Sequence, residues 1–317
     1  MAMNSEMENI KIGSVIQYFR DSYGISQSIL CRGLCSVTTL SRIEADEREA
    51  DELLLETLLE RLGKTPNQFE LILTNLDYVL YQNREEIKEQ ISNKNYDEAY
   101  KLLDIYEKEA ASKGSVHKQF IVASKAMLNE EKGGAAEKTL ELLMKAISYT
   151  VPDYKSLEIE NIYLSNIEFI IMIQIIQKMI YIGTIDGAKK ILFQLIAYFD
   201  IHPSMEGNRA LYPQLAIIAC RLLIQERKFS DALEICNKGL KMNKGNRKLD
   251  YLGDLYLLQA QITEEILKSH DKWNKENKEC LKTYLQAYYV YEFCEEKTKT
   301  EEIRKHIQEE YGWEDID

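Results

Sequence analysis

The chain has 317 residues, of which 45% are hydrophobic and 29% charged, and its formal net charge is −12. This length suggests about two domains, and the hydrophobic share is enough to build real cores. Pro (4) and Gly (14) are scarce while Leu, Ile, Glu and Lys are common, which excludes a strand-rich chain and predicts one that is nearly all helix.

Other classes of protein are excluded by local patterns. The first ten residues lack the basic start and apolar run of a secretory signal. The most apolar segment, Ile167 to Ile182, predicts a buried helix rather than a membrane span because it is broken by Glu168, Gln174, Gln177 and Lys178. The six cysteines show no C-x-x-C spacing and the four histidines are scattered, so no metal site, disulfide framework or cofactor is expected. We expect a cytoplasmic protein.

The first elements in chain order form a compact helical motif. Apolar residues recur at helical spacing from Ile10 to Tyr23, and Gly24 supplies a left-handed stop. Ser26 is a good N-cap for a second short helix, Gly33 opens the turn after it, and Ser36 can cap a third helix. Two short helices around a tight turn are the layout of a helix-turn-helix, whose second helix enters a DNA major groove.

The outer face of the third helix carries residue types suited to reading bases. Arg can grip guanine, Thr and Ser can bond base edges, and Val or a Thr methyl can press on a thymine methyl. The start of the second helix is a place where backbone amides often meet a phosphate. Each residue also has an ordinary alternative, as a solvated surface residue or, for Val37, as core. The predicted DNA-contacting residues are Gln27, Ser36, Val37, Thr38, Thr39, Ser41 and Arg42.

The charge of this region runs against DNA binding. Residues 1 to 74 contain 7 Lys and Arg but 12 Asp and Glu, a balance of −5, whereas phosphate contacts usually need a basic surface. Placement resolves the conflict if the acids between residues 44 and 60 face elsewhere. The cations would then gather on one face, and these are Lys11, Arg20, Arg32, Arg42 and Arg48.

The stretches ISQSIL and GLCSVTTLSRIE and the following helix, Glu52 to Leu62, resemble the XRE/Cro-type helix-turn-helix family. The resemblance covers about residues 10 to 73 and implies a five-helix domain that reads DNA as a dimer. Asp51 can cap the fourth helix, and Thr65 and Pro66 can start the fifth.

Beyond residue 73 a polar helix, residues 74 to 92, is predicted to link this head to weakly repeated segments. The segments begin at Tyr96, Ala136, Ile185, Phe229 and Lys278. Each contains a small or slender residue, namely Ala99, Thr139, Ala188, Ala232 and Cys280, at spacings of 40 to 49 residues. These spacings exceed the roughly 34 of a standard tetratricopeptide unit but leave room for a helical hairpin.

Such hairpins bury their faces only by stacking into a solenoid with a concave surface. The predicted partner helices span residues 118–129, 157–182, 211–226 and 251–267, and a last helix runs from Thr300 to Tyr311. The predicted fold is therefore all-α, with an N-terminal five-helix helix-turn-helix domain followed by a TPR-like α-solenoid.

A concave surface lined with amides suits an extended peptide, because amides can pair with backbone groups that lose their bonds to water. The alternative for each candidate is an ordinary surface residue or a hydrogen bond between helices. The predicted peptide-binding residues are Asn129, Asn166, Gln174, Gln214, Arg221, Tyr251 and Gln259.

The order of an XRE-type head, a linker helix and about five degenerate repeats resembles the RRNPP family, the PlcR, PrgX and Rgg group of Gram-positive bacterial regulators. The resemblance implies a homodimeric cytoplasmic transcription regulator without catalysis, whose partners are double-stranded DNA and a short imported signalling peptide, not a membrane. The predicted domains are residues 1–73 for DNA binding, 74–92 as linker helix and 93–317 for peptide binding and dimerisation.

Two alternatives remain. The repeats can instead bind a protein partner while a degenerate head is silent on DNA, which would make the chain an interaction scaffold. An enzyme is disfavoured, because no nucleophile, metal cluster or glycine-rich phosphate loop accompanies the scattered carboxylates.

Overall fold

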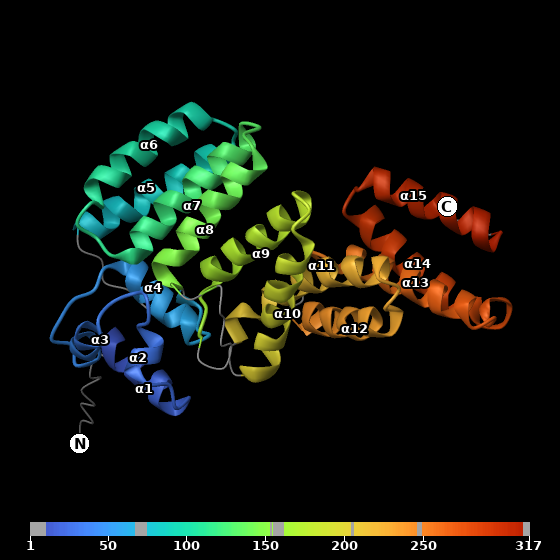
Figure 1. The fold of residues 1–317 in the computed structure, drawn as a ribbon, viewed down its shortest axis with the longest axis horizontal. Coiled ribbons are helices and arrows are strands. Elements are labelled where there is room, and N and C mark those ends of the chain that lie inside the picture. Colours follow the sequence, from blue (N-terminus) through green and yellow to red (C-terminus); the bar gives the residue numbers. More distant parts are fainter. Residues whose placement is uncertain are drawn as a thin grey trace, which may run out of the picture. The chain divides into compact units, whose positions relative to one another are not determined.

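The structure, a computed structural model, describes residues 11–66, 75–152, 154, 162–203, 206–245 and 249–312. Every regular element within these ranges is a helix (Figure 1). The chain divides into two compact units, Met1–Asn208 and Arg209–Asp317. The prediction of an all-helical chain is confirmed for the part of the chain that is described.

The first unit begins with the head, whose described helices are α1 (Ile12–Ser22), α2 (Gln27–Leu30), α3 (Val37–Glu44) and α4 (Glu52–Arg61). The three predicted N-caps are confirmed, because Ser26, Ser36 and Asp51 each accept a hydrogen bond from the backbone N–H three residues on. Gly24, which ends α1, and Gly33, in the turn after α2, have φ angles of 67° and 75°, in the left-handed region that favours glycine. The predicted fifth helix lies outside the described residues.

The core of the head is apolar and extends beyond the head itself. Ile16, Leu30, Leu40 and Leu58 are fully buried, and each comes from a different helix. Val116, which belongs to the following repeats, is 4% exposed within the same cluster. The head therefore shares its core with the repeats instead of closing on itself.

The rest of the first unit consists of α5 (Asn75–Ser92), α6 (Tyr96–Glu109), α7 (Ser115–Glu131), α8 (Ala136–Thr150), α9 (Asn166–Tyr181) and α10 (Ile185–Ile201). Consecutive helices pack as the pairs α5 with α6, α7 with α8 and α9 with α10. The predicted starts at residues 96, 136 and 185 are confirmed.

Helix α9 begins later than the predicted start at residue 157. Residues 162–165 are not helical, because Ser165 and Glu168 form a capping box that starts the helix at Asn166; residues 157–161 lie outside the described residues. The apolar side chains of α9, such as Phe169 and Ile176, are fully buried. Among the described helices, none is long and apolar enough to cross a membrane.

The second unit contains α11 (Tyr212–Gln225), α12 (Phe229–Gly245), α13 (Leu252–Ser269), α14 (Trp273–Phe293) and α15 (Lys297–Tyr311). A short 3-10 helix, η3 (Glu206–Leu211), contains the division between the units. The predicted start of α12 is confirmed, whereas α14 begins five residues before the predicted Lys278 and α15 three residues before Thr300. Helices α11 with α12 and α13 with α14 form its hairpins.

The small residues used to align the repeats share one environment. None of them is more than 1% exposed, and they are Ala99, Thr139, Ala188, Ala232 and Cys280. Small side chains at these positions let the helices of a hairpin approach closely. The repeat interpretation is confirmed by their burial and by the helical hairpins around them.

Candidate nucleic-acid interface and ligand hollow

Helix α3 has one buried and one open face. Leu40 is fully buried and Ile43 is 3% exposed, whereas Thr38, Ser41 and Arg42 are exposed to solvent. The split follows from helical spacing, because residues three and four apart share a face. The structure therefore leaves open the face on which the predicted base contacts lie.

The flanking candidates on α3 differ in exposure. Val37 is 45% exposed, which excludes its alternative as a core residue. Ser36 is exposed, but its hydroxyl is occupied as the N-cap, 3.0 Å from the Thr39 backbone nitrogen and 2.9 Å from its hydroxyl. Thr39 is half-buried. A DNA contact by Ser36 or Thr39 would therefore have to share groups that already serve the helix start.

A buried cluster lies beneath α3. The Glu44 carboxylate, 3% exposed, accepts hydrogen bonds from Arg20 Nε at 2.6 Å, Arg20 Nη2 at 2.9 Å and Gln27 Nε2 at 2.6 Å. These bonds with Glu44 raise the pKa of Arg20. The expectation that Arg20 joins an exposed basic face is wrong, because Arg20 is only 8% exposed and neutralises Glu44. The amide of Gln27 points to the same carboxylate.

Four of the expected cations do reach solvent, and these are Lys11, Arg32, Arg42 and Arg48. Arg48 lies against α3, because its backbone N–H donates to the Arg42 carbonyl at 3.2 Å and its guanidinium lies 3.4 Å from the Thr39 hydroxyl. Glu47 and Glu49 on the same loop are also exposed. The surface around α3 is thus mixed in charge, with two arginines beside the predicted recognition face.

Several of the acids of α4 face the repeats instead. Glu52 is 5% exposed and forms a buried ion pair with Arg84 of α5. The Glu60 carboxylate accepts from the backbone and side-chain nitrogens of Asn166 at 3.0 and 3.2 Å, and burial raises the pKa of Glu60 to about 7. Glu52 and Glu60 therefore face α5 and α9 rather than the open surface of α3.

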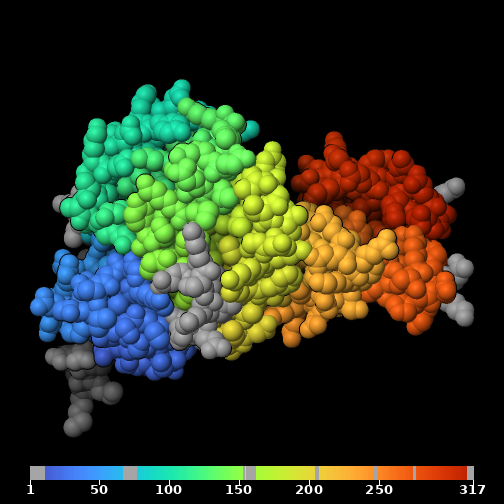
Figure 2. Space-filling view, viewed as in Figure 1, coloured from blue at the N-terminus to red at the C-terminus, as the bar shows by residue number. Residues whose placement is uncertain are grey.

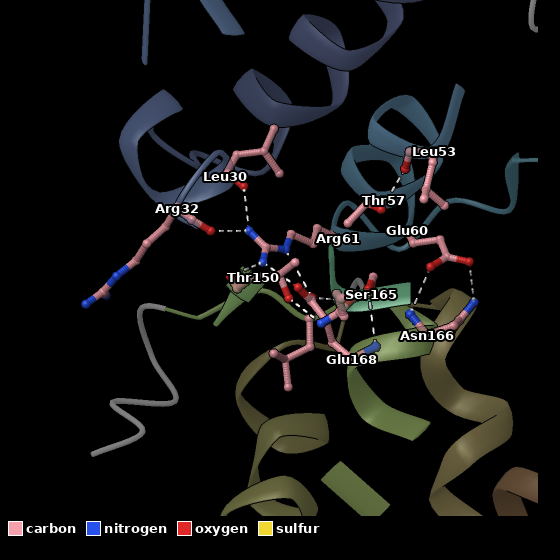
Figure 3. Close-up of polar contacts among 12 residues, drawn as sticks. Leu30, Arg32, Leu53, Thr57, Glu60, Arg61, Thr150, Ser165, Asn166 and Glu168 are labelled. Atoms are coloured by element: carbon pink, nitrogen blue, oxygen red, sulfur yellow. Dashed lines mark hydrogen bonds and ion pairs between the residues drawn. The ribbon is translucent and has the colours of Figure 1, made fainter. Parts of the chain in front are cut away.

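The most extensive polar contact of the head is made by Arg61 (Figure 3). Its guanidinium, 2% exposed, binds the Glu168 carboxylate of α9 through Nη2 at 2.6 Å and Nε at 3.1 Å. It also donates to the Leu30 carbonyl at 3.0 Å, the Arg32 carbonyl at 2.7 Å and the Thr150 carbonyl at 2.9 Å. All five N–H groups of the guanidinium are used.

Glu168 illustrates how this charge is kept buried. The carboxylate is fully buried, which alone would favour the neutral acid, but the charge and hydrogen bonds of Arg61 hold the pKa of Glu168 below its usual value. It also accepts from the Ser165 backbone nitrogen at 2.7 Å. One carboxylate therefore both starts α9 and pairs with the head.

Two further contacts close the head onto the repeats, which lie directly against it in Figures 1 and 2. His117 of α7 lies between the Asp51 carboxylate, 3.0 Å from its Nε2, and the Tyr106 hydroxyl, 2.6 Å from its Nδ1. Gly33 approaches the end of α8 so closely that a Cβ there would lie 2.1 Å from the Thr150 carbonyl oxygen. Only glycine fits at this point of the helix-turn-helix.

The second unit contains a hollow of about 870 Å³ between α11, α13 and α15. Apolar side chains, among them Leu257 and Ile303, line part of it. The lining carboxylate of Glu264, 5% exposed, accepts from Tyr284 Oη at 2.7 Å, His306 Nε2 at 2.9 Å and Lys268 Nζ at 2.5 Å. Although burial opposes it, these donors lower the pKa of Glu264 to about 2.

Other charged groups of the hollow are free to meet a ligand. Arg227, Glu265 and Glu302 line it and are exposed, and none of the three forms an ion pair with a described residue. Ligand pockets commonly enclose about 300–1,000 Å³ with mostly apolar walls and a few convergent polar groups. The hollow has that size and that mixture.

The seven predicted peptide-binding residues are divided between the two units. Asn129, Asn166 and Gln174 belong to the first unit and the other four to the second. Asn166 lies at the contact with the head, and the amide of Asn129 donates to Thr139 Oγ1 at 2.9 Å. In the second unit, Gln259 donates to Asn237 at 2.7 Å and Arg221 lies 3.5 Å from the Asp254 carboxylate. Gln214 is half-buried and Tyr251 is 37% exposed. The described lining of the hollow includes none of the seven.

Arg61, at the contact between head and repeats, and Glu264, in the hollow, were not predicted as functional residues from the sequence. Each stands in a row of apolar residues on one face of its helix. Arg61 follows Leu54 and Leu58 at helical spacing, and Glu264 lies between the buried residues Ala260 and Leu267 of α13. A charged residue at a core position of a helix signals a buried partner. The sequence does not say which partner, because Glu168 is 107 residues away from Arg61.

No protein-family model matches the sequence, and no curated protein matches it either. Among solved structures, Bacillus thuringiensis PlcR in complex with the peptide PapR7 and DNA is 16% identical, with a TM-score of 0.53 over 92% of this chain and 98% of that chain. The same protein in its apo form is 14% identical, with a TM-score of 0.50 over 92% and 97%. The apo form of the competence regulator ComR from Streptococcus vestibularis is 16% identical, with a TM-score of 0.45 over 95% and 98%.

At these identities the likeness to PlcR concerns the fold. PlcR belongs to the group that the sequence resembles, and the match runs over nearly the whole of both chains. This chain has an all-helical fold in which a helix-turn-helix head precedes TPR-like repeats.

Proposed function

We propose that this chain is a sequence-specific DNA-binding transcription regulator of the cytoplasm, with an XRE-type head and repeats that bind a short signalling peptide. The open face of α3 carries this proposal. Thr38, Ser41 and Arg42 project from a helix whose other face is anchored in the core, as a recognition helix in a major groove requires.

The acidic composition is compatible with this role because of where the acids lie. Glu44 and Glu52 are buried in ion pairs with Arg20 and Arg84, so they add little field at the α3 surface. Arg42 and Arg48 remain exposed beside it. A single head with so few exposed cations binds DNA weakly, because phosphate contacts supply most of the affinity.

A homodimer would supply a second head and so double the phosphate contacts. The linker helix α5 exposes Tyr78 by 50%, Val79 by 40% and Tyr81 by 37%. Exposed aromatic side chains of this kind are enriched in protein interfaces. We propose that two chains pair through the repeat domain and this helix, and the molar mass of the purified chain in sedimentation tests the pairing.

The peptide is proposed to bind in the repeats, and the hollow of the second unit is the best-formed described place for it. An apolar peptide side chain would cover Leu257 and Ile303, while the free charges of Arg227, Glu265 and Glu302 could pair with peptide termini or side chains. The seven residues predicted from the sequence stay candidates for the remainder of the peptide's length.

The test is selection of DNA from a random pool by the purified chain, with and without a peptide extract of culture medium. We expect a defined sequence to be enriched, binding that weakens steeply with salt, and a change in that binding when the peptide is present.

The variant Arg42→Ala should then weaken binding to the selected sequence by about 1–3 kcal/mol and relax specificity at one base pair. The matched control is Lys101→Ala, which removes one exposed positive charge from α6. Equal effects of the two variants would remove Arg42 from the interface. No enriched DNA together with a stably captured protein partner would favour the scaffold alternative.

A further inference from the structure

The end of α4 and the first turn of α9 are joined by consecutive residues. Glu60 accepts two hydrogen bonds from Asn166, and Arg61 binds both oxygens of Glu168 (Figure 3). The capping box of Ser165 and Glu168 fixes that first turn. The start of a repeat helix is therefore bound directly to the head.

Arg61 extends this contact to the helix-turn-helix itself. Through Nη1 it holds the carbonyl of Leu30, the last residue of α2, at 3.0 Å and that of Arg32, in the segment joining α2 to α3, at 2.7 Å. Through Nη2 it holds the Thr150 carbonyl at the end of α8 at 2.9 Å. One guanidinium thus connects α8, α9 and the chain that leads into the predicted recognition helix.

We propose that Arg61 and Glu168 are positioning residues for α3, so that the DNA-reading element includes the end of α8 and the first turn of α9. The inference rests on the proposed function, since it names the residues that hold the proposed recognition helix in place.

Two observations favour positioning over a purely structural or a blocking contact. The contact leaves the outer face of α3 open, because Thr38, Ser41 and Arg42 are exposed while Arg61 is bound. The turn also has no slack, since any Cβ on Gly33 would collide with the Thr150 carbonyl. A shift of the end of α8 toward the head must therefore move the turn or break the contact.

The chain offers a matched control for the burial of charge. Arg84 and Glu52 form an ion pair with side chains 4% and 5% exposed, close to the 3% and 0% of Arg61 and Glu168. The control pair joins α4 to α5, whereas Arg61 and Glu168 join α4 to α9. Breaking it removes a comparable buried pair without touching the turn.

The experiment uses the full chain and the variants Arg61→Gln, Glu168→Gln, their double variant and Arg84→Gln. Affinity for the DNA sequence selected by the wild type is measured at fixed salt, at a temperature where circular dichroism shows every variant to be folded. Hydrogen exchange of the backbone amides of residues 31–36 is measured on the same samples without DNA.

We expect Arg61→Gln and Glu168→Gln each to weaken DNA binding about tenfold, the double variant to add little to either, and Arg84→Gln to stay near the wild type. Exchange of residues 31–36 should rise in the first three variants only. Equal losses in Arg84→Gln, or tighter DNA binding by Arg61→Gln, would overturn the positioning role.

The measurements distinguish a failure of the proposed function from a failure of the positioning role of Arg61 and Glu168. If the wild type selects no DNA, the proposed function fails, and the exchange of residues 31–36 alone decides whether Arg61 fixes the turn. If the wild type responds to DNA and peptide but exchange and affinity are unchanged in Arg61→Gln and Glu168→Gln, the proposed function stands and the positioning role is wrong.

Discussion

The two units each bury a carboxylate, but in different surroundings. Glu168 in the first unit and Glu264 in the second are at most 5% exposed and both have lowered pKa values. Glu168 is held by Arg61, whose side chain is 3% exposed. Glu264 is held by Tyr284, His306 and Lys268, and the latter two have side chains 35% and 39% exposed.

The two clusters differ in whether their charges and contacts can respond to pH or to a bound molecule. Arginine stays charged at every pH a protein meets, and the Arg61 contact is sealed from water, so it can only hold or break. The donors around Glu264 include a histidine, whose charge changes near neutral pH, and they line a hollow open to a ligand. The first cluster suits fixing a geometry and the second suits responding to a molecule.

The largest effect should follow from breaking the sealed cluster. Glu168→Gln leaves the Arg61 charge buried without a counterion, which we expect to cost about 3–5 kcal/mol in the stability of the first unit. Hydrogen exchange of the slowest amides in α7 and α9 reports this locally, while amides of α13 and α14 serve as an internal control. Unchanged exchange in α9 would contradict this prediction, because it would mean that water solvates the Arg61 guanidinium in the variant.

The glycine at the same contact should come next. Gly33→Ala places a Cβ 2.1 Å from the Thr150 carbonyl oxygen at a φ of 75°, and we expect a loss of about 2–4 kcal/mol. Gly24→Ala is the matched control, because Gly24 has a similar φ of 67° but nothing within 4 Å of its Cβ position. The control should lose only about 1 kcal/mol. Similar melting temperatures of the two variants would mean that the turn can retreat from α8.

A smaller effect is expected in the open cluster. Glu264→Gln weakens the hydrogen bonds from Tyr284, His306 and Lys268, and removing a charged acceptor of this kind costs about 1.5–3 kcal/mol. The loss should appear as faster exchange in α15, which contributes His306, and not in α9. The exposed neighbour Glu265→Gln is the control and should leave exchange in α15 unchanged.

The smallest effect is a dependence on pH. Hydrogen bonding to Glu264 raises the pKa of His306, so the stability that His306 adds is fully present below about pH 6.5. It is lost as the pH rises through the raised pKa of the folded protein. Because a third of this side chain meets water, we expect less than about 1 kcal/mol.

The measurement is exchange of the α15 amides on either side of neutral pH, corrected for the intrinsic dependence of exchange on pH. His306→Gln, which cannot be charged, should abolish the difference. Helix α9 can also change between these pH values, because Glu60, which accepts the Asn166 N–H at the first turn of α9, has a pKa raised to about 7. A pH difference in α15 that persists in His306→Gln would contradict the assignment to His306.

Much of the fold could be predicted because it depends on local pattern. Scarce Pro and Gly, apolar residues at helical spacing and the capping residues Ser26, Ser36 and Asp51 are read within a few residues of one another. The same holds for the small residues such as Ala99 and Ala188, whose burial follows from their place in a helical stripe. The start of α9 was placed wrongly because apolar residues before Ser165 imitate a continuing helix.

The functional surfaces were less predictable because their polar side chains form hydrogen bonds and ion pairs with residues that are distant in the sequence. Arg20 was expected at the surface, but Glu44, 24 residues on, buries it. Asn166, a predicted peptide contact, donates from its side chain to Glu60, 106 residues away in the sequence. In both cases a polar side chain binds a carboxylate instead of water. The residues beside it in the sequence do not indicate which carboxylate this is.

The sequence by itself determined that this chain is helical, where its caps and turns lie, and which residues of α3 face outward, since each depends on contacts within one helix or one turn. The tertiary structure decided which charges remain exposed. It showed that Arg61 ties the helix-turn-helix to α8 and α9, and that a hollow forms around Glu264. The physical reason is that a buried charge must be paired, and pairing joins residues that only folding brings together.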